Sequence, residues 1–539
     1  MRVRNLWKIG LVCALFVGLA ATQGAAEGDT RRAALMTEVE AAIAQAPEVR
    51  PLAEWGGKIG PAAARREIAG LLAKAGHFAE AERMAAGIAR STDRNWALGD
   101  VALSLAQDGQ VLRAFKLLDA VDDAGQLSQA LYDILTPKAT DTVEIVLSGT
   151  EERAAALRAV KRVADLGRRL GDPERLDQAF FEAASFYLDL GETEAAKVLI
   201  DQIEGDGFQV YWVAKQIDKL VETGDFVEAE RLADTISEDY ANWPLAYWSL
   251  ALGLAAEDRP ADARRVLGHL VQPYAKVLLG TQVAVALPES YPVASGEFLA
   301  EAGKLAVGIT DPEDRVEALG TVGAAFAEIG ESDMAQALAA QLIAAQAGPD
   351  ATSAALNSIA WAEGEAGQGE AASRLLHASE RQAGLIGVAE DRASALWSVA
   401  WYRTELGQYA EAERVAADID EAEHRVWALE KLGVALAGAG LASEAQRIAA
   451  SISDTEGSND LPGEGLDEIA EALAAMGAVD AAETVAGEIV DPAWRANAMG
   501  DVVAALAEAG QLSAAERIAR RIEDPAWRAV ALAAVAGGL

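Results

Sequence analysis

The stretch that decides the fold is a heptapeptide that occurs twice near the end of the chain. Val490-Asp-Pro-Ala-Trp-Arg-Ala496 recurs as Glu523-Asp-Pro-Ala-Trp-Arg-Ala529, and the interval from Gly477 to Gly510 is the same. A period of about 33 residues, with alanines at helical spacing, is typical of stacked helix pairs. The sequence therefore predicts an all-α solenoid in which each unit contributes two antiparallel helices.

A glycine marks the turn between the two helices of each predicted unit. Such a glycine permits the left-handed backbone that ends a helix. The turn glycines are Gly76, Gly109, Gly191, Gly224, Gly330, Gly367, Gly407, Gly440, Gly477 and Gly510. Four of their intervals equal the period of the heptapeptide, and a segment that begins near Gly296 fits the same length up to Gly330. The intervals that begin at Gly330, Gly367 and Gly440 are longer, which indicates short insertions.

Apolar residues define one face of each helix around these glycines. Before Gly510, apolar residues at helical spacing are Met499, Val502, Val503 and Leu506; after it they are Ala515, Ile518, Ala519 and Ile522. Asp491-Pro492 and Asp524-Pro525 predict helix starts, because Asp caps free amides and Pro fits the first turn.

This pattern resembles the tetratricopeptide repeat (TPR) family over most of residues 60–539. An Ala follows the glycine by five residues, a small residue by nine and an apolar residue by twelve, and Leu precedes it by eleven. The chain departs from the family in its slightly shorter period and in the Leu319, Leu429 or Met499 that fills an aromatic slot. The resemblance implies a right-handed superhelix that binds peptides or proteins on its concave face. No peptide-clamp residue of the family carries over.

The net charge of the chain restricts the classes of molecule that it can bind. The 84 acidic and 46 basic residues give a net charge of −38, which repels nucleic acids and anionic membranes. Hydrophobic residues make up 51% of the chain, which is too many for a disordered protein. The acidity fits plain solubility, and a basic protein partner is the alternative.

The N-terminus predicts an export signal over residues 1–26. A basic start is followed by the apolar run Ile9–Ala21 and by Gly24-Ala25-Ala26 as a cleavage site. The alternative is an uncleaved anchor. The only cysteine, Cys13, lies in this segment, so a mature chain would have no thiol chemistry. We expect a periplasmic or secreted protein with no membrane span after the signal is removed.

Two further segments complete the predicted organisation. Residues 27–58 form an N-terminal cap and linker, in which Asp29–Ala46 reads as an amphipathic helix with apolar Leu35, Val39, Ala42 and Ile43. Residues 59–539 form the repeat array.

Two polar residues recur in register with the repeat. An arginine lies fifteen residues before the turn glycine (Arg94, Arg315, Arg392, Arg425, Arg495 and, in phase, Arg528), and a glutamate lies six after it (Glu82, Glu230, Glu413, Glu483 and Glu516). We expect these rows to form ion pairs between the two helices of a unit. The alternative is a row of guanidinium groups that faces an acidic ligand.

Aromatic residues give the only candidate binding site. The densest group is Tyr211, Trp212, Tyr240, Trp243, Tyr247 and Trp248, a candidate peptide pocket, although a thicker core explains it as well. Trp96, Trp427, Trp494 and Trp527 fall at repeat positions, and Trp397 and Trp401 lie one helical turn apart; packing between repeats is expected for these.

No residue pattern indicates catalysis, a cofactor or a metal. His77, His269, His377 and His424 lie in different units without a second ligand at metal spacing, and the acidic segment Asp454–Gly465 lacks the EF-hand residues at its sixth and twelfth positions. The predicted function is an exported, non-enzymatic scaffold or adaptor that binds a protein or peptide. The alternatives are an accessory activator of cell-wall enzymes and a glycan-binding or glycan-processing enzyme.

The chain ends after the first helix of its last unit. No second helix follows to cover Val530, Leu532 and Val535. Since a solenoid needs a polar cap at its end, this end is expected to pack back on its own hairpin or to dock on another chain.

Overall fold

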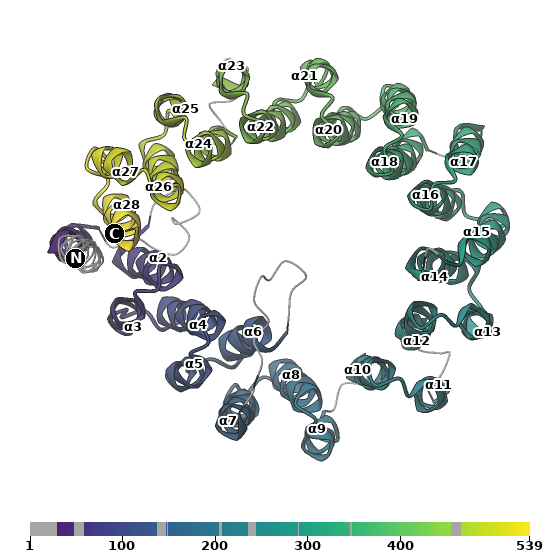
Figure 1. Cartoon of the computed structure of the whole chain (residues 1–539), viewed down its shortest axis with the longest axis horizontal. Coiled ribbons are helices and arrows are strands. Elements are labelled where there is room, and N and C mark those ends of the chain that lie inside the picture. Colours follow the sequence, from purple (N-terminus) through teal and green to yellow (C-terminus); the bar gives the residue numbers. More distant parts are fainter. Residues whose placement is uncertain are drawn as a thin grey trace, which may run out of the picture. The chain divides into compact units, whose positions relative to one another are not determined.

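The computed structural model describes residues 30–47, 59–136, 147, 149–203, 207–235, 244–288, 290–344, 348–453 and 465–538. Every regular element in these ranges is a helix, and successive helices form pairs joined by short turns (Figure 1). The predicted all-α solenoid of helix pairs is confirmed.

The chain divides into two compact units, each of which is described by itself. One unit contains the described residues up to Leu166 and those from Leu436 onward, and the other contains Gly167 to Ala435. The first unit has an unlabelled helix at residues 30–43, followed by α2 (Pro61–Lys74), α3 (Phe78–Ala86), α4 (Ser91–Gln107), α5 (Val111–Leu118), α6 (Ala124–Leu135), α7 (Thr150–Gly167), α23 (Ala442–Ser453), α24 (Leu466–Ala475), α25 (Val479–Glu488), α26 (Pro492–Glu508), α27 (Leu512–Ala519) and α28 (Pro525–Gly537).

The second unit contains the middle of the array. Its helices are α8 (Pro173–Asp189), α9 (Thr193–Ile200), α10 (Gly207–Glu222), α11 (Phe226–Ala233), α12 (Pro244–Ala256), α13 (Pro260–His269), α14 (Pro273–Ala286), α15 (Pro292–Val307), α16 (Pro312–Glu328), α17 (Ser332–Ala344), α18 (Pro349–Glu365), α19 (Gly369–Ala383), α20 (Ala389–Glu405), α21 (Tyr409–Ala417) and most of α22 (Ala422–Gly438).

The turn glycines adopt the backbone that the repeat requires. All ten predicted glycines have positive φ, between 69° and 84°, where a side chain would be strained. Asp258 has φ 58° and makes the equivalent turn between α12 and α13 without a glycine. The repeat segment predicted to begin near Gly296 was wrong, because Gly296 lies inside α15 and is not a turn glycine.

The first helices of successive units pack closely because small residues line their crossings. A Cβ added at Gly320 of α16 would lie 2.7 Å from the Cβ of Ala355 on α18. The predicted helix starts are also confirmed. The Asp491 carboxylate accepts hydrogen bonds from the amides of Ala493 at 2.7 Å and Trp494 at 3.0 Å, which satisfies donors that the helix leaves free.

The helix at residues 30–43 lies in the first unit, between the second helices α27 and α3. Its predicted apolar face is buried: Leu35, Val39 and Ile43 are at most 2% exposed. Ion pairs connect it to both neighbours: Arg31 to Glu516, Glu38 to Arg520 at 2.5 Å, and Arg32 to Glu80 at 3.5 Å.

The last helix, α28, packs on α2, the first helix of the array (Figure 1). A Cβ added at Gly537 would lie 3.2 Å from the Cβ of Ala75, the residue that ends α2. The His77 ring nitrogen Nε2 is 3.2 Å from the carbonyl oxygen of Gly537.

The expectation for the C-terminal end was therefore wrong. Val530, Leu532 and Val535 are buried within this chain, and α28 packs on α2 as well as on α26 and α27. Residues 30–43 lie beside α27, in the place that a second helix following α28 would take. The residues that join this helix to α27 lie near opposite ends of the sequence. The repeat pattern alone therefore does not predict the contact between residues 30–43 and α27.

In the described part of the chain, no helix is both long and apolar enough to cross a membrane. The predicted signal segment, residues 1–26, lies outside the described residues.

Candidate functional site

The arginine row does not pair with the glutamate row of the same unit. Each arginine instead donates to the main-chain carbonyl of an isoleucine six residues earlier, where the preceding second helix has ended. The bonds run from Arg94 to Ile88 (3.5 Å), Arg315 to Ile309 (3.1 Å), Arg392 to Ile386 (3.1 Å), Arg425 to Ile419 (2.9 Å), Arg495 to Ile489 (3.4 Å) and Arg528 to Ile522 (3.0 Å). The arginines therefore fix the connection between successive units.

The glutamate row pairs with the second helix of the next unit. Glu82 accepts from Arg113 at 2.7 Å and Glu483 from Arg517 at 2.7 Å, and Glu230 pairs with Arg265. The pair between Glu516 and Arg31 continues this row onto the helix at residues 30–43. The helix at residues 30–43 therefore forms the same ion pair that a second helix forms with the second helix of the unit before it.

Substitution of the row arginines tests their structural role. Arg425→Gln and Arg495→Gln should each lower the free energy of unfolding by about 1–2 kcal/mol, because a charged hydrogen bond to a carbonyl is lost. Arg83→Gln, which removes an exposed pair with Glu80 at 3.9 Å, should change it by less than about 0.5 kcal/mol. Urea unfolding measures all three. Equal effects would contradict a carbonyl-capping role.

The aromatic group predicted as a peptide pocket is not assembled as one surface in the described residues. Tyr240 and Trp243 lie outside them. Trp212 is buried in α10, while Tyr211 beside it is 45% exposed. Tyr247 is buried and donates to Asp234 at 2.9 Å, and the Trp248 indole donates to Gln282 at 2.7 Å. Trp212 and Tyr247 therefore belong to the core, and Trp248 forms a contact between two helices.

A different set of rings forms a continuous surface on α18, α20 and α22. We call this set the aromatic strip: Trp361, Tyr402, Trp401, Trp397, Trp427 and His424. Successive ring centroids in this order are 6.0, 4.7, 6.4, 6.4 and 5.0 Å apart. All six residues are partly exposed, and the His424 side chain, which is 14% exposed, pairs with Glu421 at 2.7 Å. The strip thus crosses three successive units and consists of partly exposed residues, although the indole nitrogen of Trp397 is buried.

Sequence reasoning missed the strip as a site, although one signal was present. Trp397 and Trp401 are one turn apart on a first helix, and Trp427 follows Trp397 by close to one repeat. Trp361 joins the strip through its ring contact with Tyr402. The Tyr402 hydroxyl also forms a hydrogen bond with Ser358 of α18, and burial raises the pKa of this hydroxyl.

A buried cation lies on the same helix as the centre of the strip. Arg403 follows Trp401 and Tyr402 on α20 and is 0% exposed. It donates to Gln408 at 2.9 Å and to Glu380 of α19 at 3.3 Å. Burial alone would raise the pKa of Glu380, but Arg414, which donates to it at 2.8 Å, outweighs this and lowers that pKa. The network therefore fixes the helix that carries the centre of the strip.

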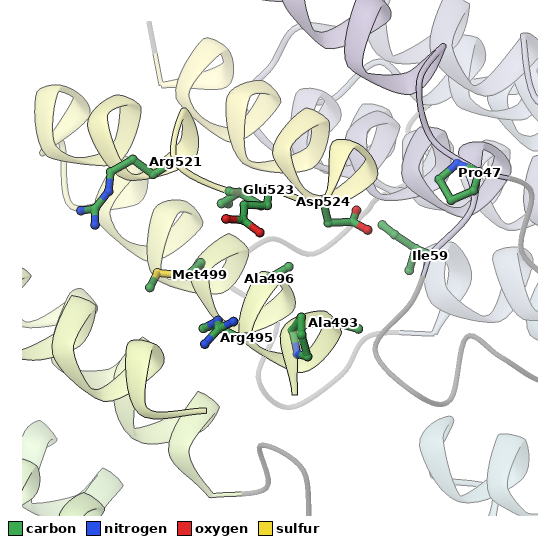
Figure 2. Close-up of a pocket in the computed structure, with 11 residues that line it drawn as sticks. Pro47, Ile59, Ala493, Arg495, Ala496, Met499, Arg521, Glu523 and Asp524 are labelled. Carbon is green, nitrogen blue, oxygen red and sulfur yellow. The ribbon is translucent and has the colours of Figure 1, made fainter. Parts of the chain in front are cut away.

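The first unit holds a pocket of about 540 Å³ beside α26 and α28 (Figure 2). It is lined by Pro47, Ile59, Pro492, Ala493, Arg495, Ala496, Met499, Arg521, Ile522, Glu523 and Asp524. Three of its four charged side chains already have structural partners, since Arg521 pairs with Glu483. Arg495 donates to the Ile489 carbonyl, and Asp524 accepts from the amides of Ala526 and Trp527. The pocket is therefore a weaker candidate than the strip.

Asp501 of α26 is a strongly perturbed acid in the first unit. Burial, and then the negative charges of Glu471, Asp467 and Glu67, raise its pKa to about 7. Its oxygen accepts a hydrogen bond from Asn497 at 3.2 Å. Ionised Asp501 is thus disfavoured in the folded protein.

Asp501→Asn should stabilise the protein at pH 8. Unfolded aspartate ionises near 3.8 and the folded one near 7, so stability is lost as the pH rises between these values. The shift would correspond to about 4 kcal/mol if fully realised, and partial solvent access reduces this to on the order of 2 kcal/mol. Urea unfolding at pH 5 and pH 8 should show a smaller loss for the Asn variant. An identical loss in both proteins would refute the raised pKa.

Within the described residues, no group of three His, Cys, Asp or Glu side chains could hold a metal ion. The histidines fall into separate environments. His77 contacts Arg32 and Gly537, His269 stacks on Tyr247 at 5.1 Å, and His424 ends the aromatic strip. The acidic segment Asp454–Gly465 lies outside the described residues, apart from Gly465.

The fold defines an all-α helical-repeat protein, and the comparisons add no family to this class. No protein-family profile matches the chain, and no curated protein matches it. A crystal structure of Ton1535 from Thermococcus onnurineus NA1 is 17% identical, covers 60% of this chain and 98% of its own, and has a TM-score of 0.28. A circular tandem repeat protein with novel repeat topology and enhanced subunit contact surfaces is 15% identical, covers 85% and 87%, and has a TM-score of 0.16. Neither likeness is close enough to support an inference about function.

Proposed function

We propose that this chain is a non-enzymatic, TPR-like scaffold of the cell envelope that binds a protein or peptide partner. The aromatic strip is the observation that supports this. Half-buried Trp and Tyr side chains offer large contact areas at low cost in conformational entropy, and they are enriched where proteins bind one another. The series of rings across α18, α20 and α22 offers such a surface to a partner that spans several units.

A photo-crosslinking residue tests this proposal in the native cells. Ser394 is exposed on α20, one turn before Trp397, so a crosslinker there should capture a protein partner. Glu370, on the second helix α19, is 99% exposed and serves as the control position. Capture at Ser394 that is absent at Glu370 and is lost with Trp401→Ala supports the proposal. Equal capture at both positions, or none at Ser394, contradicts it.

Two further measurements address the other parts of the proposal. Cell fractionation should place the mature chain, without residues 1–26, in the periplasm or the medium; full-length chain in the membrane fraction would favour the uncleaved anchor. Purified protein should show no turnover of cell-wall or glycan substrates. Turnover that Trp401→Ala abolishes would contradict a non-enzymatic role.

A further inference from the structure

We infer that the aromatic strip binds an extended protein segment rich in arginine, through stacking of guanidinium groups on the indole rings. This inference rests on the proposed function and names the chemistry of the partner. It follows from three properties of the strip: the order of its rings, the carboxylates that flank it, and the engagement of the cations on its own helices.

The order of the rings favours an extended ligand. Each step from Trp361 to His424 is 6.4 Å or less, and the steps pass from α18 through α20 to α22. A compact ligand could contact two or three of these rings. A ligand that contacts all of them must run across the first helices of three successive units.

A carboxylate lies one helical turn from a strip tryptophan on each of the three helices. Glu365 follows Trp361 by four residues, Glu405 follows Trp401 by four, and Glu423 precedes Trp427 by four. Residues four apart share one face of a helix. All three glutamates are exposed, and none forms an ion pair with another described residue. The strip is therefore bordered by negative charge that is not neutralised within the described chain.

The cations of the same helices are engaged elsewhere. Arg392 and Arg425 donate to the carbonyls of Ile386 and Ile419. Arg403 is buried against Glu380, and Lys431 pairs with Glu430 at 2.8 Å. The described parts of these helices thus combine partly exposed aromatic residues with exposed carboxylates, while their arginines are committed to other groups.

This combination selects a cationic ligand. A guanidinium over an indole face is attracted by the ring quadrupole, most strongly where water is partly excluded. Arginine suits the strip better than lysine, because its planar group both stacks on the ring and donates to a neighbouring carboxylate. A peptide fits better than a nucleic acid, whose phosphates the net charge of −38 repels.

Synthetic peptides of defined sequence test the inference on the full mature chain. The probes are eight-residue peptides that alternate Gly with Arg, Lys or Gln, a proline octamer, and a chitin oligosaccharide. Isothermal titration should show the tightest binding for the Arg peptide, weaker binding for the Lys peptide and none for the others. Raising the salt concentration from about 50 to 500 mM should weaken binding of the Arg peptide, because the flanking carboxylates are exposed.

Substitutions locate the binding. Trp401→Ala should raise the Kd of the Arg peptide by about 3- to 30-fold, the factor expected for loss of one cation–π contact. Glu405→Gln should raise the Kd and reduce its dependence on salt. The control is Trp96→Ala, on α4 of the other unit, where the side chain is 41% exposed; it should leave the Kd unchanged.

The outcomes separate this inference from the proposed function. Binding of the Gln, proline or chitin probe that is as tight as that of the Arg peptide, or an equal effect of Trp96→Ala, would overturn the arginine-specific inference. If crosslinking at Ser394 still captured a protein in that case, the scaffold function would stand. Absence of both peptide binding and capture would overturn the two proposals together.

Discussion

Val39→Asp is expected to destabilise the first unit by about 3–5 kcal/mol, since it places an unpaired charge in a fully buried apolar position. Val39 is 0% exposed in the helix at residues 30–43. The loss of stability should extend to helices far away in sequence, because this helix packs beside α27 and α3 and completes the last repeat. Hydrogen exchange should therefore become faster in α2, α27 and α28.

Ala34→Asp is the matched control, because Ala34 is exposed on the same helix. It should change stability by less than about 0.5 kcal/mol. A synthetic peptide of residues 30–46, added to a chain that lacks them, should restore slow exchange in α28. Equal stability of the Val39 and Ala34 variants, or no recovery with the peptide, would show that the helix is not part of the last repeat.

Glu380→Gln should lower the stability of the second unit by about 2–4 kcal/mol, because it removes the charge partner of the fully buried Arg403. The estimate is below that for a fully buried pair, since Glu380 is 22% exposed. Near-ultraviolet circular dichroism should also change, because Arg403 directly follows Trp401 and Tyr402 of the strip.

Arg403→Met provides the comparison that identifies the cause. Methionine fills similar space without a charge, and Glu380 keeps its bond from Arg414. The Arg403 Nε atom also has no hydrogen-bond partner among the described residues. This variant should therefore stay within about 1 kcal/mol of the original protein. If Arg403→Met lost as much stability as Glu380→Gln, the loss in Glu380→Gln could not be assigned to an unpaired buried charge on Arg403.

Local features of the repeat could be predicted from the sequence because they depend on a few residues in fixed positions. The ten turn glycines have the predicted left-handed backbone, and Asp491 and Asp524 cap their helices as predicted. The turn at Asp258 was missed, since its residue type carries a much weaker signal for positive φ than glycine.

The features that could not be predicted are contacts between units. The row arginines could reach either a carboxylate or a carbonyl, and the sequence does not distinguish these acceptors. The aromatic strip depends on the rotation of α18, α20 and α22 relative to one another, which the period of the repeat does not determine. The placement of residues 30–43 beside α27 depends on the packing of the whole first unit.

A disulfide between α28 and the end of α2 tests the central structural claim most directly. A Cβ at Gly537 would lie 3.2 Å from the Cβ of Ala75, slightly closer than the mean of about 3.8 Å in disulfides. Ala75→Cys with Gly537→Cys, in a chain without Cys13, should form an intramolecular bond on mild oxidation. Mass spectrometry should then find the peptides of residues 75 and 537 joined in a monomer. Free thiols, or bonds only between two copies, would contradict the packing of α28 on α2.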